Sequence, residues 1–323
     1  MATPRTVSGY DLRVRFDDDA GLDASEVQDM RGSGGGGGGI GGRVALGGGG
    51  LGVVGLIIYF VISQLGGISP GAVNLGSGGG LGSVGSGQQV DNSQLASTCK
   101  TGADANKNHD CAIVAIVNSV QDYWAQQFAR SGSTYRKAPT NFFNGGVRTG
   151  CGSATSDTGP FYCPADSEVY IDLNFFDELK TRFGAQGGQF TEAYVLAHEY
   201  GHHVQNLLGT SKKGTGTGPT SGSVRLELQA DCYAGVWGNH ATTTPTDTGK
   251  PLILDITQDD IASALDTASR IGDDYIQTKL GGGQVDSSQF THGTSAQRKK
   301  WFTTGFQTGD PTRCDTFGTN NLG

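Results

Sequence analysis

The sequence has little basic charge, few apolar residues and no Cys-x-x-Cys pair. It holds 23 Lys and Arg against 31 Asp and Glu, a net charge of −8. Nucleic acid and anionic lipid surfaces are disfavoured as main partners, because both require clustered basic side chains. Apolar residues make up 35% and glycines number 55, so the glycine-rich N-terminal part cannot build a core. The missing Cys-x-x-Cys disfavours a thiolate zinc site.

The N-terminal third divides into three segments. Residues 1–43 combine charge and glycine with few apolar side chains, which predicts a disordered cytoplasmic tail. Residues 44–65 carry no charge, and their length of about 33 Å as a helix spans a bilayer core. They lie too far from the N-terminus for a signal peptide, and no A-x-A site is found. We therefore predict a transmembrane helix over 44–65, a Gly/Ser-rich stalk over 66–93 and a folded domain over 94–323.

The flanking charges predict an orientation. Arginines precede the apolar stretch, and no Lys or Arg follows it until Lys100. The positive-inside rule then places the N-terminus in the cytoplasm and the domain outside the cell, as a single-pass protein of the cell membrane. A soluble core helix is the alternative for 44–65, although the stretch has no amphipathic face. The arginines are Arg5, Arg13, Arg15, Arg31 and Arg43.

All six cysteines follow the apolar stretch. An even number of spaced cysteines is typical of disulfides in an oxidising compartment, which agrees with an extracellular domain. Reduced cysteines in a cytosolic protein are the alternative. Two pairs each enclose eleven residues and leave a long-range third pair. The spacing therefore suggests Cys99–Cys111, Cys151–Cys163 and Cys232–Cys314.

Apolar patterning and capping residues predict a helix-dominated α+β domain with a small sheet. Residues 161–173 alternate and are rich in aromatic and β-branched side chains, so we predict a strand there. Predicted helices cover 111–130, 190–208 before Gly209, 224–238 capped by Ser223, 258–280 capped by Thr257, and 298–306 after a cap at Ser295.

The central motif is Leu-Ala-His-Glu-Tyr-Gly-His-His-Val-Gln over residues 196–205. His198 and His202 are four residues apart and share one helix face, so both imidazoles can bind one zinc ion. Glu199 lies beside the metal and can take a proton from a zinc-bound water. By helical phase His203 points away from this pair, and we interpret it as structural.

A catalytic zinc usually takes three protein ligands and leaves a position for water. Glu227 is the strongest candidate for the third ligand, since it and Asp231 share a face of an otherwise apolar helix. Asp231 is expected to accept a hydrogen bond from a ligating imidazole and fix its tautomer. Asp231 itself and His240 remain alternatives for the third ligand.

At these positions the sequence resembles the bacterial neutral zinc metallopeptidases, whose glutamate ligand places them in the gluzincin group. The resemblance rests on residues 198–205 and on Glu-Leu-Gln-Ala-Asp-Cys-Tyr-Ala-Gly-Val-Trp over 227–237. Further matching pieces are 159–164, 169–172, Phe175-Phe176, 291–295 and Arg298. The resemblance implies a zincin-like domain with Zn²⁺ on His198, His202 and Glu227, and Glu199 as general base.

Two further features have possible roles. The resemblance implies that a strand within 161–171 pairs with an extended substrate, whereas a core strand is the alternative. His292 is a candidate donor to the oxyanion of the tetrahedral intermediate, and Tyr275 could take the same role.

The sequence as a whole predicts a membrane-anchored zinc metallopeptidase that hydrolyses a peptide or protein. One alternative is a binding module in which zinc is structural, with His240 or Cys232 as fourth ligand. The other is a zinc hydrolase of a cell-wall amide.

Overall fold

The computed structural model describes residues 14–31, 90–246, 248–279, 281 and 283–323. The predicted transmembrane helix and most of the predicted stalk lie outside these residues. Within the described ranges, no helix is both long and apolar enough to cross a membrane.

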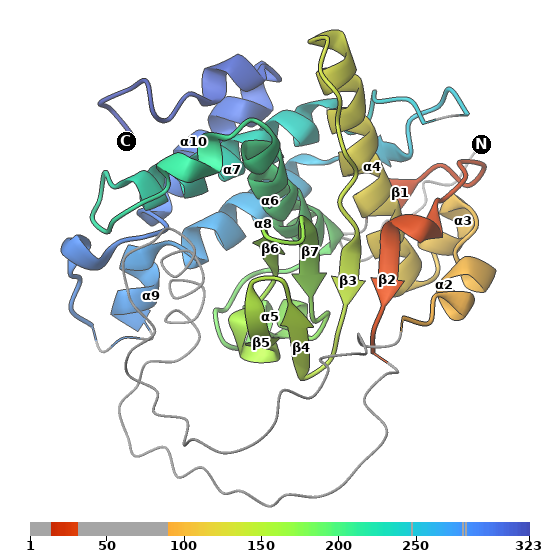
Figure 1. The fold of residues 1–323 in the computed structure, drawn as a ribbon, viewed down its shortest axis with the longest axis horizontal. Coiled ribbons are helices and arrows are strands. Elements are labelled where there is room, and N and C mark those ends of the chain that lie inside the picture. Colours follow the sequence, from red (N-terminus) through yellow and green to blue (C-terminus); the bar gives the residue numbers. More distant parts are fainter. Residues whose placement is uncertain (1–13, 32–89, 247, 280, 282) are drawn as a thin grey trace, which may run out of the picture.

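The described chain is dominated by helices, with three small sheets (Figure 1). The helices are α2 (Ser93–Thr98), α3 (Gly102–Ala105), α4 (His109–Arg130), α5 (Phe175–Thr181), α6 (Gln189–Leu207), α7 (Gly222–His240), α8 (Gln258–Arg270), α9 (Asp273–Lys279) and α10 (Ser295–Thr308). The strands are β1 (Arg15–Phe16), β2 (Val27–Asp29), β3 (Thr140–Phe142), β4 (Gly146–Thr149), β5 (Gly152–Thr155), β6 (Phe161–Cys163), β7 (Glu168–Ile171) and β8 (Ile253–Asp255). This content confirms the predicted helix-dominated α+β class.

The largest sheet has the order β2-β3-β7-β6 (Figure 1). The first three strands run parallel, and β6 runs antiparallel to β7. Strand β6 therefore forms one edge of the sheet, and it packs against α6 together with β7. Strands β4 and β5 form a separate hairpin, and β1 pairs with β8.

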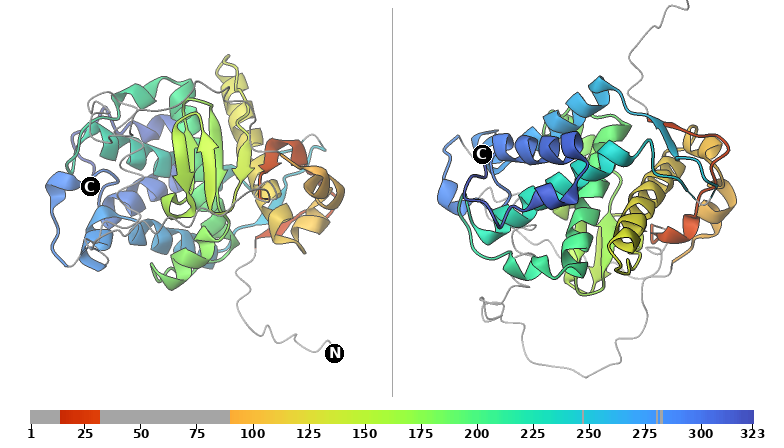
Figure 2. Two further views of the ribbon diagram at one scale, coloured as in Figure 1. Left: turned by 60° about the horizontal axis from the view of Figure 1, so that its bottom comes forward. Right: turned by 90° about the horizontal axis from the view of Figure 1, so that it is seen from above.

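Helix α7 packs against both α6 and α10 (Figure 2, right). Glycines make the contact with α10 close. A Cβ on Gly235 would lie 2.1 Å from the Phe302 carbonyl oxygen, and one on Gly305 would lie 1.9 Å from the Cys232 carbonyl oxygen. Neither position can carry a side chain at this separation. The backbone of α7 is thus held between the helix with the zinc motif and the C-terminal helix.

Two predicted helix starts shift in the structure. The Ser221 hydroxyl accepts from the N–H of Val224 and caps α7, so Ser223 lies inside the helix. At α10 the cap is Thr294, whose side chain forms a capping box with Gln297. Ser295 is therefore the first helical residue, because its neighbour satisfies the free N–H groups better.

The single helix predicted over 258–280 is wrong, because α8 ends at Arg270 and α9 begins at Asp273. The break is filled by the loop before α10. The Asp273 carboxylate accepts the main-chain N–H groups of Thr291, His292 and Gly293, and a Cβ on Gly272 would lie 2.4 Å from the Ser295 nitrogen. Tertiary contacts thus override the local helical pattern.

The single strand predicted over 161–173 is also corrected to a hairpin of β6 and β7. The intervening turn contains Ser167 in the left-handed region, with φ of 64°. Pro164 opens this turn, and proline followed by small polar residues favours turns over strands.

The predicted disordered tail is corrected for residues 14–31, which form β1, β2 and a 3₁₀ turn on the folded domain. Val14, Phe16 and Val27 are almost completely buried. These three side chains are spread through a stretch rich in charge and glycine, so its average composition does not reveal them, although each fills a core position. Residues 1–13 and 32–43 of the predicted tail are outside the described ranges.

The three predicted disulfides are confirmed: Cys99–Cys111, Cys151–Cys163 and Cys232–Cys314. The first joins the residue after α2 to the start of α4. The last ties the middle of α7 to the chain beyond α10, 82 residues away in sequence.

Candidate metal centre

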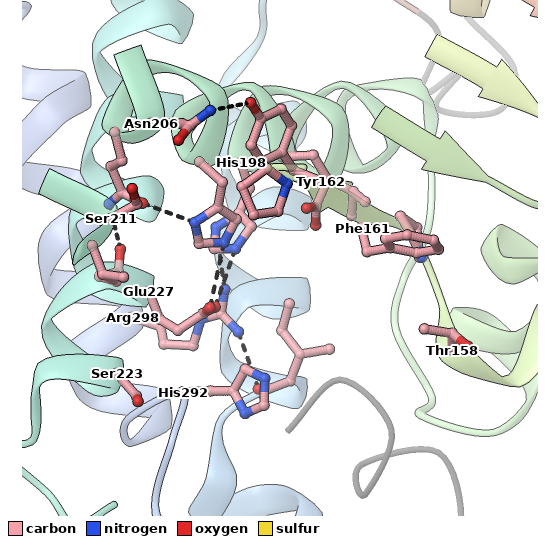
Figure 3. Close-up of a pocket in the computed structure, with 18 of the residues that line it drawn as sticks. Thr158, Phe161, Tyr162, His198, Asn206, Ser211, Ser223, Glu227, His292 and Arg298 are labelled. Atoms are coloured by element: carbon pink, nitrogen blue, oxygen red, sulfur yellow. Dashed lines mark hydrogen bonds and ion pairs between the residues drawn. The ribbon is translucent and has the colours of Figure 1, made fainter. Parts of the chain in front are cut away.

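The three predicted ligands lie together at the contact of α6 and α7 (Figure 3). One oxygen of the Glu227 carboxylate is 3.2 Å from His198 Nε2, and the other is 3.3 Å from His202 Nε2. The three candidate ligand atoms lie within 4.8 Å of one another. Gly201 allows this approach, because a Cβ there would lie 3.0 Å from the Ala230 backbone on α7.

The His198 ring is oriented from behind by Asp231, as the sequence predicted. Nδ1 of His198 is 2.9 Å from Asp231 Oδ1, so donation from Nδ1 leaves Nε2 free to bind a metal. Asp231 also accepts from the Tyr194 hydroxyl at 2.6 Å and from Arg298 Nε and Nη2 at 2.8 and 2.9 Å. Burial opposes ionisation of Asp231, but Arg298 and His198 outweigh it and hold the pKa at about 2.

The His202 ring is oriented by a residue that the sequence analysis missed. Its Nδ1 lies 2.9 Å from Gln205 Oε1. The Gln205 amide donates in turn to the Leu226 carbonyl on α7 at 2.8 Å, which fixes the orientation of the amide. The available signal was a glutamine three residues after a ligand on the same helix.

Glu199 lies beside the two histidines and is only 8% exposed. Burial raises the pKa of its carboxyl above 4.5, while His198, His202 and a hydrogen bond from the Tyr162 main chain act in the opposite direction. A carboxylate with a raised pKa is a better proton acceptor near neutral pH. Tyr162 belongs to β6, so the edge strand contacts this carboxylate directly.

His292 lines the same pocket as the three ligands (Figure 3). Its Nδ1 is 3.1 Å from Asp273 Oδ1. Burial lowers the pKa of His292, but the neighbouring Asp273 outweighs this effect and raises it. The ring can therefore carry a proton into the pocket.

The alternative ligands from the sequence analysis do not join the cluster. His240 Nε2 lies 2.9 Å from the Gly309 carbonyl oxygen, and Cys232 is in a disulfide. Tyr275, the alternative candidate for the oxyanion donor, donates instead to the Phe183 carbonyl oxygen. Across the described ranges, the only group of three or more His, Cys, Asp or Glu side chains arranged for a metal is His198, His202 and Glu227.

His203 faces the other side of α6, as predicted. Its Nε2 lies 2.7 Å from the Arg136 carbonyl oxygen, and its Nδ1 lies 3.0 Å from the Tyr162 hydroxyl. Burial lowers its pKa to about 4, so the ring is neutral at ordinary pH.

A cavity of about 420 Å³ opens in front of the cluster. Its walls are mainly apolar, in contrast to the polar groups around the metal centre. Phe161 and Tyr162 of β6 form one side. The remaining apolar lining includes Phe175, Phe183, Val195, Leu226, Ile271 and Ile276.

Comparison with known proteins gives relatives for most of the chain. Rv2575 of Mycobacterium tuberculosis, described as uncharacterized, is 48% identical over 231 residues, which is 70% of this chain and 77% of the relative. The uncharacterized YpfJ of Escherichia coli K12 is 43% identical over 240 residues, 72% of this chain and 78% of the relative. No solved structure matches.

The family comparison covers residues 19–317 and returns the family described as "Putative neutral zinc metallopeptidase". The match begins before the apolar stretch, inside the segment 14–31, and extends beyond α10. The family description and the His-His-Glu cluster both indicate Zn²⁺ as the cofactor. The chain therefore belongs to the neutral zinc metallopeptidase family.

Proposed function

We propose that the domain is a zinc-dependent peptidase in which His198, His202 and Glu227 hold the metal and Glu199 is the general base. The observation that carries this proposal is the three-ligand cluster facing a cavity. Structural zinc sites are closed by four protein ligands, whereas catalytic sites use three and leave a position open. The donor set of two imidazoles and one carboxylate is one that catalytic zinc accepts.

When bound, zinc would lower the pKa of a water and polarise the scissile carbonyl. Glu199 then takes a proton from the attacking water on its carboxylate and passes it to the leaving amine. Its burial supports this role, because the raised pKa brings the carboxyl nearer to the operating pH. His292, held by Asp273, donates from the pocket to the oxyanion that develops on the substrate.

The substrate is proposed to bind as an extended peptide along β6. This strand is an edge of the sheet and lines the cavity. An extended peptide can bind to such an edge as an added strand. The apolar lining beyond the metal centre favours substrates that place an apolar side chain next to the cleaved bond.

We also propose that the domain works outside the cytoplasm. Three disulfides support this location, because such bonds persist in oxidising compartments. Attachment to a membrane by residues 44–65 rests on their sequence alone and stays a prediction.

The two glutamates provide the decisive experiment. Glu199→Gln keeps shape and removes basicity, so the variant should retain its fold and about one zinc per chain and lose activity by roughly 10²- to 10⁴-fold. Glu227→Gln should instead lose zinc affinity, because it removes a charged ligand. Metal analysis measures the zinc content of the two variants, and turnover of a responsive peptide measures their activity.

Equal turnover by the parent and Glu199→Gln would refute the proposed mechanism. Profiling with peptides and with cell-wall amides separates a peptidase from the alternative hydrolase. A zinc-loaded parent that cleaves neither class would favour the binding-module alternative.

A further inference from the structure

The segment 14–31 is an integral part of the catalytic domain. Strand β2 pairs in parallel with β3 at the edge of the sheet opposite β6 (Figure 1), and β1 pairs with β8, which lies between α7 and α8 in the sequence. The segment contributes Phe16 and Val27 to the main core, with exposed fractions of 1% and 0%. Without it, β3 would present an open edge and α4 would lose part of its cover.

Polar contacts hold this segment as specifically as the core does. The buried Glu26 carboxylate accepts from Asn118 and Gln121 on α4 at 2.9 and 2.8 Å, and it pairs with Lys137. Asn118 also bonds in both directions with the main chain of Asp23. A carboxylate that is 6% exposed is tolerated because three partners satisfy it. These contacts define one position for the segment.

The chain leaves and re-enters this body at neighbouring points. The Asp91 N–H donates to the Asp29 carbonyl oxygen at 3.1 Å, and the Asp29 N–H donates to Asn92 Oδ1 at 2.8 Å. Arg31, the last described residue before the interval, pairs with Asp110 at the start of α4. Fifty-eight residues, 32–89, connect these two points, and they include the uncharged stretch 44–65.

We propose that residues 14–31 and 90–323 occupy the same side of any membrane, so that the chain crosses a bilayer between them an even number of times or not at all. A single crossing would place β2 and β3 in different compartments and leave Glu26 and its partners unpaired. This proposal replaces the sequence-based expectation of a single-pass chain with its N-terminus and its folded domain on opposite sides of the membrane. Arg31, one of the arginines behind that expectation, is engaged in the fold by Asp29 and Asp110.

Accessibility of single cysteines in the full chain tests this proposal. Ser25→Cys and Ser97→Cys place a thiol on exposed surface before and after the interval, while the native cysteines are all in disulfides. Intact cells are treated with a membrane-impermeant maleimide, and disrupted cells show that both thiols can react. The proposal requires the same outcome at both positions, either labelled or protected. Labelling of one thiol and protection of the other overturns it.

A different observation concerns how β6 is held against α6. The Tyr162 hydroxyl lies 3.0 Å from His203 Nδ1 and accepts a hydrogen bond from Asn206 Nδ2 at 2.9 Å. Figure 3 shows the contact with Asn206. Tyr162 also hydrogen-bonds Glu199 through its main chain. One residue of the edge strand is thus tied to α6 by its side chain and by its backbone.

We infer that Tyr162, His203 and Asn206 are positioning residues that set the edge strand relative to the metal centre. His203 is suited to this because Nε2 donates to the Arg136 carbonyl, leaving Nδ1 to accept from the Tyr162 hydroxyl. The inference rests on the proposed peptidase function. If substrate lies along β6, a shift of this strand weakens its contacts with the substrate residues that are distant from the cleaved bond.

The test compares a long and a short peptide that share the cleaved bond. Tyr162→Phe removes the hydroxyl, and Tyr170→Phe on β7 is the matched control, since its hydroxyl binds Asp166 and Glu168 instead. With zinc content unchanged, Tyr162→Phe should reduce the ratio of kcat/KM for the long over the short peptide by about tenfold, the loss expected from one or two hydrogen bonds. The control should keep the parental ratio.

An unchanged ratio in Tyr162→Phe overturns the inference while leaving the peptidase proposal intact. A general loss of packing would lower both rates equally and would also count against a positioning role. If the parent cleaves neither peptide nor any other peptide tested, the proposed function itself fails.

Discussion

The ion pair behind His198 predicts a large and specific effect of Arg298→Met. Arg298 and Asp231 are 2% and 0% exposed, and two nitrogens of the guanidinium bond both carboxylate oxygens. Methionine keeps much of the side-chain length and removes the charge. Among the described residues, Asp231 would then keep only its hydrogen bonds with Tyr194 and His198.

Removing one partner of a buried pair costs about 3–5 kcal/mol, because the remaining charge is uncompensated. For a domain of this size that corresponds to a decrease in Tm of roughly 6–20 °C. The double variant Arg298→Met with Asp231→Asn removes both charges. It should recover at least about 2 kcal/mol relative to Arg298→Met, because replacing a whole buried pair is often nearly neutral.

Urea unfolding of the parent, both single variants and the double variant gives the coupling energy. Each protein is measured with saturating zinc and with a chelator, since bound metal adds its own stabilisation. The reasoning fails if Arg298→Met costs less than about 1 kcal/mol. It also fails if Asp231→Asn destabilises the Arg298→Met background as much as it destabilises the parent.

Three further changes have defined outcomes. His202→Ala should abolish stoichiometric zinc binding in metal analysis of the folded protein, and full retention would contradict the ligand assignment. Gly201→Ala should weaken zinc binding in a chelator competition, since a Cβ there meets Ala230 at 3.0 Å and separates α6 from α7; an affinity equal to the parent's would show that the helices adjust freely. Replacing Cys232 and Cys314 by Ala should lower the free energy of unfolding by about 4.5 kcal/mol, and replacing Cys99 and Cys111 should lower it by about 2.8 kcal/mol. The difference arises because the closed loops span 82 and 12 residues. If urea unfolding gives the reverse order, the chain-entropy argument is wrong.

The metal centre could be predicted from sequence because its pattern is local. His198 and His202 lie one helical turn apart, and Glu227 and Asp231 repeat that spacing on the next helix. Each pair needs only a helix to bring its side chains to one face. The contact between the two helices was the remaining assumption, and the structure supplies it through Gly201 and Ala230.

The errors arose where distant parts of the chain determine the local structure. The break after Arg270 depends on the loop that follows residue 290, which supplies three N–H groups to Asp273. The order of residues 14–31 depends on Asn118 and Lys137, about a hundred residues away. Local composition carries no information about such partners. The role of Gln205 could not be predicted for a similar reason. Its amide oxygen accepts from His202 only because the Leu226 carbonyl on another helix fixes the orientation of the amide.

The orientation of both histidines on α6 depends on α7. His198 is held by Asp231, and His202 is held by Gln205, whose amide is anchored to the Leu226 carbonyl. Glu227, between these two supports, comes from α7 as well. A displacement of α7 would therefore move the third ligand and release both rings together. Helix α7 is in turn fixed to α10 by Gly235, Gly305 and the Cys232–Cys314 disulfide. The C-terminal part of the chain, which contributes no metal ligand, thus determines the precision of the metal centre by holding the helix on which the ligand geometry depends.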